Sequence, residues 1–188
     1  MNIFGHNSEK SMAEGIRKGD NQAMRDFYAQ FGGLLTAACS RYVVNEDDVK
    51  DVMQDAMVSI IQNIDSFTYH GKGSLRAWAT RIVVNQALNF LKSRKRLQDT
   101  FADKDIGNIS CADDEPDVGM VPEEVIHDMI SRLPEGYRVV FNLYAIEGKS
   151  HKEIAEALGI KADSSASQYH RARNMLAREI RKYKQEQT

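Results

Sequence analysis

GKSHKEIAEALGIKADSSASQYHRAR, which spans Gly148 to Arg173, predicts two short helices joined by a tight turn. Ser150 is a favourable N-cap residue, and Glu153 follows it at the spacing of a capping box. The apolar face of this first helix consists of Ile154, Ala155 and Leu158. Gly159 comes directly after the helix and can end it as a C-cap residue, with Ile160 packing just beyond.

The second helix of this stretch is polar and basic, and we expect Ser164 or Ser165 to cap it. The side chains that it carries are Gln168, Tyr169, His170, Arg171 and Arg173. Two short helices around a glycine-containing turn, the second one polar, are typical of a helix-turn-helix. The alternative interpretation is an ordinary helical hairpin that packs without binding DNA.

Composition places the chain among helical globular proteins. It has 188 residues, of which 28% are charged and 42% hydrophobic, and only 3 are prolines. No apolar run approaches the roughly 20 residues that span a bilayer, and the N-terminus predicts no secretory signal. Cys39 and Cys111 are far apart and lack a CxxC partner, which favours a reduced, cytoplasmic compartment over a disulfide framework.

The net charge of −2 conceals two segments of opposite sign. Residues 97–124 contain nine acidic residues and one lysine, a net charge of −8. Residues 161–188 contain seven basic and three acidic residues, a net charge of +4. The basic C-terminal segment favours nucleic-acid binding, although a solvated helical face would have the same composition.

The most regular helical pattern begins after a polar break at residues 45–47. Its apolar side consists of Val49, Val52, Met53, Ala56, Met57, Ile60, Ile61 and Ile64. At about 100° per residue, Asp48, Asp51 and Asp55 fall on the opposite side with Gln54 beside them. Such an acidic stripe is either a solvated surface or a docking face for a basic partner.

A loop at residues 67–74, FTYHGKGS, precedes a long helix expected at residues 75–96. The core-facing positions of that helix are Leu75, Trp78, Ile82, Leu88 and Leu91. Its polar and basic positions are Arg76, Arg81, Asn85, Asn89, Lys92, Arg94, Lys95 and Arg96, which suit phosphates and base edges. Phe67, Tyr69 and Trp78 suit stacking on unpaired bases, although core packing is the favoured interpretation for Trp78.

The remaining segments predict supporting structure. Residues 1–20 indicate no more than a short helix or arm, and residues 97–121 lose periodicity and indicate a linker. Pro122 followed by two glutamates predicts a helix start. Two helices after it support the helix-turn-helix in a small four-helix domain. The five histidines lack HExxH or CxxC company, so we expect no metal site, no cofactor and no catalytic constellation.

Four segments, in order along the chain, resemble the extracytoplasmic-function sigma factors of bacterial RNA polymerase. They are DVKDVMQDAM at 48–57, SLRAWATRIVVNQALNFLKSRKR at 74–96, LPEGYRVVFNLYAIEGKSHKEIAEALGI at 133–160 and HRAR at 170–173. The resemblance covers roughly residues 20–96 and 123–182. It implies a non-enzymatic promoter-specificity subunit that binds core RNA polymerase and recognises and melts promoter DNA.

The resemblance implies an all-α fold of two small helical domains. A sigma-2-like helical bundle at residues 1–97 docks on polymerase and binds the minus-ten element. An acidic linker at 98–121 joins it to a sigma-4-like helix-turn-helix domain at 122–188, which binds the minus-thirty-five element. Members of this family are commonly held inactive by an anti-sigma factor, often membrane-anchored, so such a partner is expected, whereas a small-molecule substrate is not.

The resemblance also implies roles for individual residues. The polymerase-binding residues are Asp48, Asp51, Gln54 and Asp55. The minus-ten residues are Phe67, Tyr69, Lys72, Arg76, Trp78, Arg81, Asn85, Asn89, Lys92, Lys95 and Arg96, and the 67–74 loop is expected to capture a flipped base. The minus-thirty-five residues are Ser150, Ser164, Ser165, Ala166, Gln168, His170, Arg171 and Arg173.

Two departures from the family pattern bear on these roles. Where many members have Gly-Thr-Val-Lys-Ser-Arg, residues 163–168 are Asp-Ser-Ser-Ala-Ser-Gln, so Ala166 and Gln168 replace a lysine and an arginine. Asn89 stands where an aspartate is common. A stand-alone regulator would use the helix-turn-helix but leave the acidic stripe and the 67–96 segment unexplained, and a helical interaction protein would bind no DNA.

Overall fold

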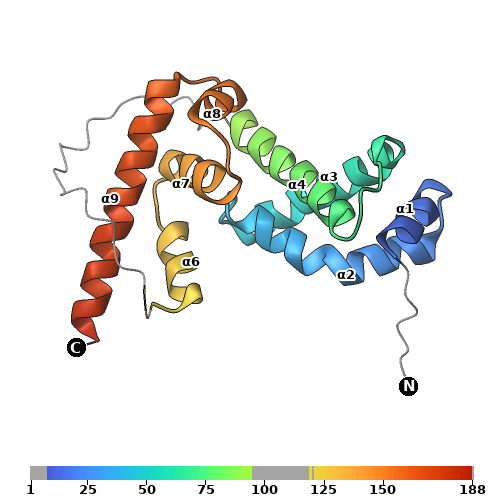
Figure 1. Ribbon diagram of the computed structural model, residues 1–188, viewed down its shortest axis with the longest axis horizontal. Coiled ribbons are helices and arrows are strands. Elements are labelled where there is room, and N and C mark those ends of the chain that lie inside the picture. Colours follow the sequence, from blue (N-terminus) through green and yellow to red (C-terminus); the bar gives the residue numbers. More distant parts are fainter. Residues whose placement is uncertain (1–7, 95–118, 120, 188) are drawn as a thin grey trace. The chain divides into compact units, whose positions relative to one another are not determined.

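The computed structural model describes residues 8–94, 119 and 121–187, and every regular element within those residues is a helix (Figure 1). The expectation of an all-helical protein is therefore confirmed. The chain divides into two compact units, Met1–Phe90 and Leu91–Thr188, near the end of helix α4. Among the described helices, none is both long and apolar enough to cross a membrane.

In the part of the chain that the structure describes, the first unit is a bundle of four α-helices and one short 3-10 turn. These elements are α1 (Glu9–Arg17), α2 (Asn21–Ser40), α3 (Glu46–Asn63), η1 (Ile64–Ser66) and α4 (Ser74–Ser93). Their apolar faces meet in a core that includes Phe27, Leu35, Ile60 and Val83, which are at most 1% exposed. Cys39 is also fully buried there, and burial raises the pKa of its thiol to about 11, so the thiol stays protonated at neutral pH. Cys111 lies outside the described residues.

Helix α3 begins where the polar break predicted it. The side chain of Asn45 accepts hydrogen bonds from the backbone N–H groups of Asp47 and Asp48, at 3.0 and 3.1 Å, and so caps the helix. The buried face consists of Val49, Val52, Met53, Ala56 and Ile60, as expected. Ile61, which was placed on that face, is instead 37% exposed because it is turned about 100° beyond Ile60.

Within its described residues, the second unit contains four α-helices and one π-helical turn, and the sequence pattern predicted these four helices. They are α6 (Glu123–Ser131), α7 (Glu135–Phe141), η2 (Asn142–Ile146), α8 (His151–Leu158) and α9 (Ala162–Glu186). The long helix α9 packs against α6, α7 and α8 (Figure 1). One core cluster joins α6, α7 and α9 and contains Met129, Leu133, Tyr137, Ala172, Leu176 and Ile180.

The predicted helix-turn-helix is formed by α8 and α9. Ser150 caps α8 in a complete capping box, in which its N–H donates to Glu153 Oε2 at 2.9 Å and its Oγ accepts from the Glu153 N–H at 3.3 Å. The hydrogen bonds from Ser150 lower the pKa of the Glu153 carboxyl. Gly159 ends α8 with φ +71°, as expected of a C-cap glycine.

The expected start of the second helix was wrong. Helix α9 begins at Ala162, two residues before Ser164, and Lys161 occupies the N-cap position without a side-chain hydrogen bond. Lys161 has extended backbone angles, φ −79° and ψ 151°, which turn the chain into the new helix directly after the Gly159 turn. Ser164 and Ser165 therefore lie inside the first turn of α9, which changes the direction in which their side chains point.

Candidate nucleic-acid and protein interfaces

The side of α3 opposite its buried face carries the predicted acidic residues. Asp51, Gln54 and Asp55 are exposed, and their side chains make no hydrogen bond or ion pair with any residue that the structure describes. Asp48 is half-buried at the start of this acidic face. Lys50, the basic residue of the segment, pairs with Asp47 at 2.9 Å in an exposed ion pair. Among the described residues, the structure therefore leaves the carboxylates of Asp51 and Asp55 unused by the fold.

An apolar residue that the sequence analysis did not single out lies on the same side of α3. Val58 is 52% exposed and follows Asp51 and Asp55 at the helical spacing of seven and three residues. The signal was present in the sequence, because Val58 falls outside the apolar pattern of its helix. An exposed apolar side chain beside carboxylates adds buried area to any contact that this face makes.

Phe67, expected to stack on an unpaired base, is buried instead. It is only 6% exposed, and its ring packs against Trp78 with centroids 5.4 Å apart. The local sequence could not reveal this burial, because Phe67 lies in a loop where no periodicity marks an inner face. Trp78 is half-buried in the same contact, which agrees with the favoured packing interpretation. Tyr69, in contrast, is 39% exposed and is available for stacking.

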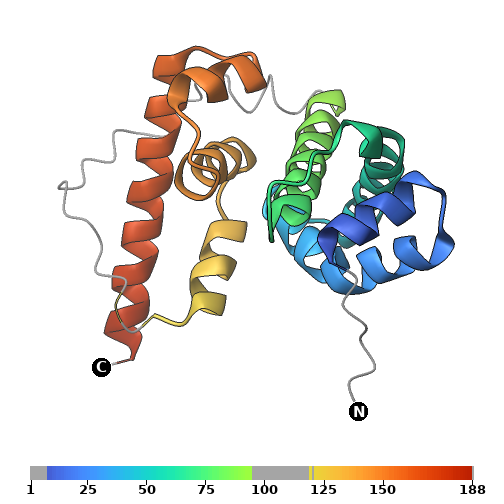
Figure 2. The same ribbon diagram turned by 45° about the vertical axis from the view of Figure 1, so that its right-hand side comes forward.

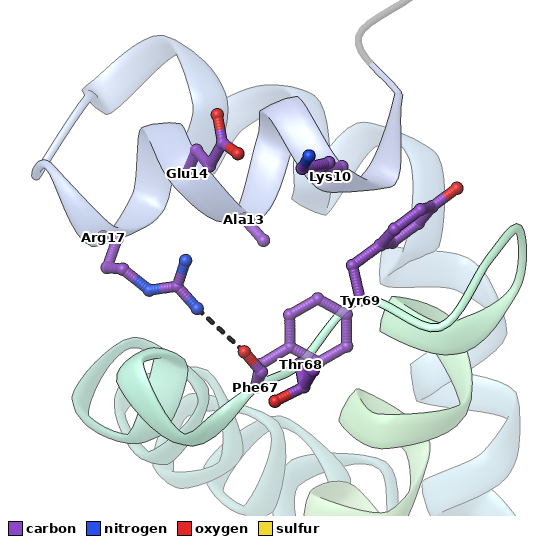
Figure 3. A pocket seen from close by; sticks show the side chains of 7 residues that line it. All are labelled: Lys10, Ala13, Glu14, Arg17, Phe67, Thr68 and Tyr69. Carbon is purple, nitrogen blue, oxygen red and sulfur yellow. Dashed lines mark hydrogen bonds between the residues drawn. The ribbon is translucent and has the colours of Figure 1, made fainter.

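Both ends of the loop that contains Tyr69 are bound by helix α1. Arg17 Nη2 donates to the carbonyl oxygens of Ile64 and Phe67 at 3.0 and 2.8 Å (Figure 3). The carboxylate of Glu9 accepts from the N–H groups of Gly73 and Leu75, at 3.0 Å each. Residues 1–20 contain no pattern that predicts these contacts, because no local signal identifies contacts between residues so far apart in the chain.

A cavity of about 340 Å³ lies between α1 and this loop. It is lined by Lys10, Ala13, Glu14, Arg17, Phe67, Thr68 and Tyr69. Figure 3 shows Arg17 pointing to the Phe67 backbone at one end, with Lys10 and Tyr69 near the other. The middle of the loop therefore does not pack down on α1, although its ends are bonded to it.

Helix α4 presents four exposed polar side chains at the spacing of one helical stripe. They are Arg81, Asn85, Asn89 and Lys92. We call this set the α4 stripe. Arg76 is exposed on the opposite side of α4, and Lys72 is exposed in the preceding loop. Lys95 and Arg96, the other basic residues expected to contact DNA, lie outside the described residues.

Two residues expected to contact DNA from α9 are buried. Ser165 is fully buried, and its Oγ lies 3.0 Å from His151 Nδ1 of α8. Gln168 is 5% exposed, with its Oε1 buried and lacking a hydrogen-bond partner among the described residues. Ser165 lies on the side of α9 that packs on α8, and Gln168 is buried within the second unit. Their contact with a DNA groove stays a prediction that this burial does not support.

The exposed side of the first turns of α9 carries a different set. It consists of Asp163, Ala166, Ser167 and His170, which recur at helical spacing. We call this set the α9 exposed face. Ala166 and His170 were expected on this face, whereas Ser167 was not. Ser167 lies four residues after Asp163 and three before His170, and this spacing predicts that it shares their face. Ser164 is half-buried, and Ser150 is exposed at the start of α8.

The two arginines of the HRAR segment are both half-buried. Arg171 Nη1 lies 3.5 Å from the hydroxyl of Tyr137, which is itself part of the core cluster. Arg173 follows on the next face of the helix. The contact with the tyrosine hydroxyl links Arg171 of α9 to Tyr137 of α7.

Aromatic rings fix α8 against the neighbouring elements. His151 stacks on Tyr144 with centroids 4.4 Å apart, and Tyr144 in turn contacts Tyr169 at 4.4 Å. Phe141 also stacks on Tyr169, with ring centroids 6.0 Å apart. This cluster joins η2, α8 and α9, so it sets the angle between the two helices of the helix-turn-helix.

The comparisons with known proteins agree with this architecture. Residues 27–97 match the family model of sigma-70 region 2, and residues 123–176 match that of sigma-70 region 4. The ECF RNA polymerase sigma-E factor of Haemophilus influenzae is 27% identical over 183 residues, which cover 92% of this chain and 95% of that protein. The ECF RNA polymerase sigma factor SigW of Bacillus subtilis is 27% identical over 184 residues, with coverage of 92% and 96%.

Among solved structures, CnrH in complex with the cytosolic domain of CnrY is similar to this chain. The sequence identity is 24% and the TM-score 0.48, over 92% of this chain and 96% of that chain.

The chain belongs to the sigma-70 family of transcription initiation factors, within the extracytoplasmic-function group. It is a promoter-specificity subunit that acts with core RNA polymerase on promoter DNA to direct transcription initiation. Such subunits select and open promoters while polymerase makes RNA, so the chain is not an enzyme.

Substitution of two neighbouring serines tests the observed orientation of α9. We expect Ser165→Ala to lower the free energy of unfolding by about 1 kcal/mol relative to Ser167→Ala, because only Ser165 loses a buried hydrogen bond. The higher helix propensity of alanine raises the stability of both variants alike and cancels in the comparison. Urea unfolding of the full chain measures the difference, and equal stabilities would contradict the orientation described above.

Proposed function

We propose that the acidic face of α3 is the surface that docks on core RNA polymerase. The observation that supports this proposal best is the chemistry of Asp51, Gln54 and Asp55, which are exposed and bond to none of the described residues. Exposed carboxylates in a row attract a basic partner surface and steer its approach. Asp48 and Val58 extend the contact at the two ends of the row.

The second proposed surface holds the minus-ten element as unpaired DNA. Tyr69 is exposed in the loop that precedes α4, the helix that carries the α4 stripe. Its ring can stack on a base that has left the duplex. Arg81 and Lys92 supply charge for phosphates, and Asn85 and Asn89 supply amides that pair with base edges. Stacking is worth about 1–3 kcal/mol per base, which offsets the few kcal/mol that unpairing a base costs.

In this proposal Phe67 and Trp78 support the loop from below and do not stack on bases. The two rings pack against each other and support the loop from which Tyr69 projects. Lys72 is exposed in the loop and Arg76 just after it, so both can meet the phosphates that flank the captured base. Lys95 and Arg96 would extend the basic surface beyond the α4 stripe.

The third proposed surface is the α9 exposed face, which enters the major groove at the minus-thirty-five element. His170 and Ser167 can bond to base edges, and Ala166 can contact a thymine methyl group. Ser150 and Ser164 stand near the helix starts, where backbone N–H groups favour phosphates. Arg173 can reach the DNA backbone, whereas Arg171 holds α9 to Tyr137. With Ala166 and Gln168 in place of basic residues, this surface carries little phosphate attraction of its own.

We further infer that the two DNA-binding surfaces belong to separate domains, at residues 1–97 and 122–188, joined by the linker at 98–121. When polymerase holds both domains, the first promoter contact makes the second intramolecular and raises its effective concentration. Two weak domains can then select one promoter with high specificity.

We also infer that the protein works in the cytoplasm, where its polymerase is, and that an anti-sigma factor restrains it. The family supports this inference, since its members are commonly controlled by such a partner. An anti-sigma factor that is anchored in the membrane would tether this protein there through the anchor of the anti-sigma factor.

Reversing the charge of the acidic face tests the polymerase contact. We expect Asp51→Lys combined with Asp55→Lys to weaken binding to core polymerase roughly 100-fold or more, because like charges then face each other across the interface. Both side chains are exposed and bond to no described residue, so stability should change by less than about 0.5 kcal/mol. Co-purification and titration with core polymerase measure the binding.

The matched control is Glu14→Lys combined with Glu46→Lys, which changes the net charge by the same amount. Glu14 lies on α1, and Glu46 lies on the opposite side of α3 from Asp51 and Asp55. This control should retain core binding. Equal loss in both double variants would mean that only net charge matters, and retained binding in the acidic-face variant would refute the proposed docking surface.

Adding a charge to α9 tests the proposed major-groove surface. We expect Ala166→Lys to tighten binding of the full chain to duplex promoter DNA and to steepen the salt dependence by about one released counterion. The same charge added at Gln185, at the exposed far end of α9, should have no comparable effect. Fluorescence anisotropy over a range of salt concentrations measures both, and identical slopes for the two variants would argue against this DNA-facing orientation.

A further inference from the structure

The bonds that Arg17 makes with the loop are too specific for an incidental surface contact. One guanidinium nitrogen donates to two carbonyl oxygens, those of Ile64 and Phe67, at 3.0 and 2.8 Å. The Nε of the same group lies 3.4 Å from the carboxylate of Asp65. Arg17 therefore fixes the backbone at the point where η1 ends and the loop begins.

Glu9 performs the corresponding task at the other end of the loop. Its carboxylate accepts from the N–H groups of Gly73 and Leu75, the first of which precedes α4 and the second of which lies in its first turn. A carboxylate at a helix N-terminus is favoured by the unpaired N–H groups and by the helix dipole. Gly73 has φ +92°, so the backbone turn that presents these N–H groups requires glycine.

Helix α1 is itself firmly seated, which makes it the anchor of these bonds. Met12, Ala13 and Ile16 are at most 3% exposed, and α1 packs against α2 and η1 (Figure 2). A Cβ added at Gly15 would lie 2.6 Å from the Cβ of Ala23, which shows how closely α1 approaches α2. The loop is therefore held by the bundle through α1.

Between its two bonded ends the loop stays open. Thr68, Tyr69 and His70 are exposed, and Thr68 and Tyr69 line the cavity of about 340 Å³ together with residues of α1. Figure 3 shows the same division, with Arg17 bonded to the backbone and the Tyr69 ring away from it. The ends of the loop are fixed while the side chains in its middle remain accessible.

We propose that Glu9 and Arg17 are positioning residues that shape the 67–73 loop for capture of an unpaired promoter base before DNA arrives. The proposal rests on the capture role given above to Tyr69. A loop that is already ordered loses less conformational freedom on binding, so its affinity for single-stranded DNA is higher. Neither Glu9 nor Arg17 needs to touch DNA for this effect.

The test uses holoenzyme formed from core polymerase and the full chain. The probe is a fluorescein-labelled single strand that carries the non-template minus-ten region of a promoter mapped with this protein. We expect Glu9→Gln to bind the probe roughly tenfold more weakly, because a neutral amide is a poorer acceptor for the two N–H groups. Its matched control, Glu14→Gln, removes the same charge from the same helix and should bind at least as tightly as the wild type.

Whether Glu9→Gln raises or lowers the affinity for the DNA probe distinguishes long-range electrostatics from positioning of the loop. Removing an acidic residue near a DNA-binding loop strengthens DNA binding if only long-range electrostatics matter. Weaker binding by Glu9→Gln and unchanged or tighter binding by Glu14→Gln is therefore expected only if the hydrogen bonds of Glu9 act through the loop. Equal behaviour of the two variants would overturn the proposal.

Arg17→Lys separates a positioning role from a phosphate contact. Lysine keeps the charge but cannot bond two carbonyl oxygens and the Asp65 carboxylate in the geometry of the guanidinium. We expect roughly tenfold weaker binding with an unchanged salt slope. Wild-type affinity in Arg17→Lys would show that the guanidinium geometry is not needed and would overturn the positioning role of Arg17. An Arg17→Ala salt slope smaller by about one phosphate contact would show that Arg17 binds DNA directly and would also overturn that role.

Two further measurements distinguish failure of this proposal from failure of the proposed function. In the free full chain, hydrogen exchange at the Gly73 and Leu75 amides should be faster in Glu9→Gln than in Glu14→Gln, by more than the difference between their urea midpoints accounts for. If Tyr69→Ala binds the probe normally, the loop is not the capture site and both proposals fall. If Tyr69→Ala binds weakly while the Glu9 and Arg17 variants bind normally, only the positioning role falls.

Discussion

Each helix of this protein has one apolar side to bury, and that constraint decides which side chains remain for partners. In α3 the burial of Val52, Ala56 and Ile60 turns Asp51 and Asp55 to solvent, because the two sets lie on opposite sides of one helix. In α9 the burial of Ala172 and Leu176 leaves His170 and Ala166 outside. A functional surface here is the part of each helix that the fold does not use.

The loop between η1 and α4 has no helical periodicity to determine its shape. Hydrogen bonds from residues far away in the sequence hold its two ends instead. The bonds of Glu9 and Arg17 join residues more than forty positions apart in the chain. The packing of Phe67 against Trp78 also supports the loop. In this account the acidic face, the loop and α4 form one unit, and α9 with its supporting helices forms the other. We propose that each unit carries a surface too weak to select a promoter alone, and that attachment to polymerase combines them.

Local patterns in the sequence were enough to predict much of this architecture. The apolar repeat of α3, the capping box at Ser150 and the C-cap at Gly159 are decided within a few residues, so they could be identified from spacing. The family resemblance, carried by motifs in order, led to the sigma factor that the family comparisons then established.

Other features depended on contacts between distant residues and were missed. The family resemblance assigned Ser165 and Gln168 to the minus-thirty-five contacts, but both side chains are buried, and Ser165 Oγ lies 3.0 Å from His151 Nδ1 of α8. Arg138 is only 6% exposed, and burial lowers its pKa while Nη1 donates to the Leu133 carbonyl at 3.0 Å. No local rule predicts a buried cation of this kind. The role of α1 was missed for the same reason.

Run-off transcription with cognate core polymerase on sheared genomic DNA tests the central claim most directly. With this protein added, we expect discrete new transcripts whose start sites share two upstream elements at a constant separation. Core polymerase alone should not produce them. If the protein binds core polymerase and yet no discrete start depends on it, the claim that this chain selects and opens promoters is contradicted.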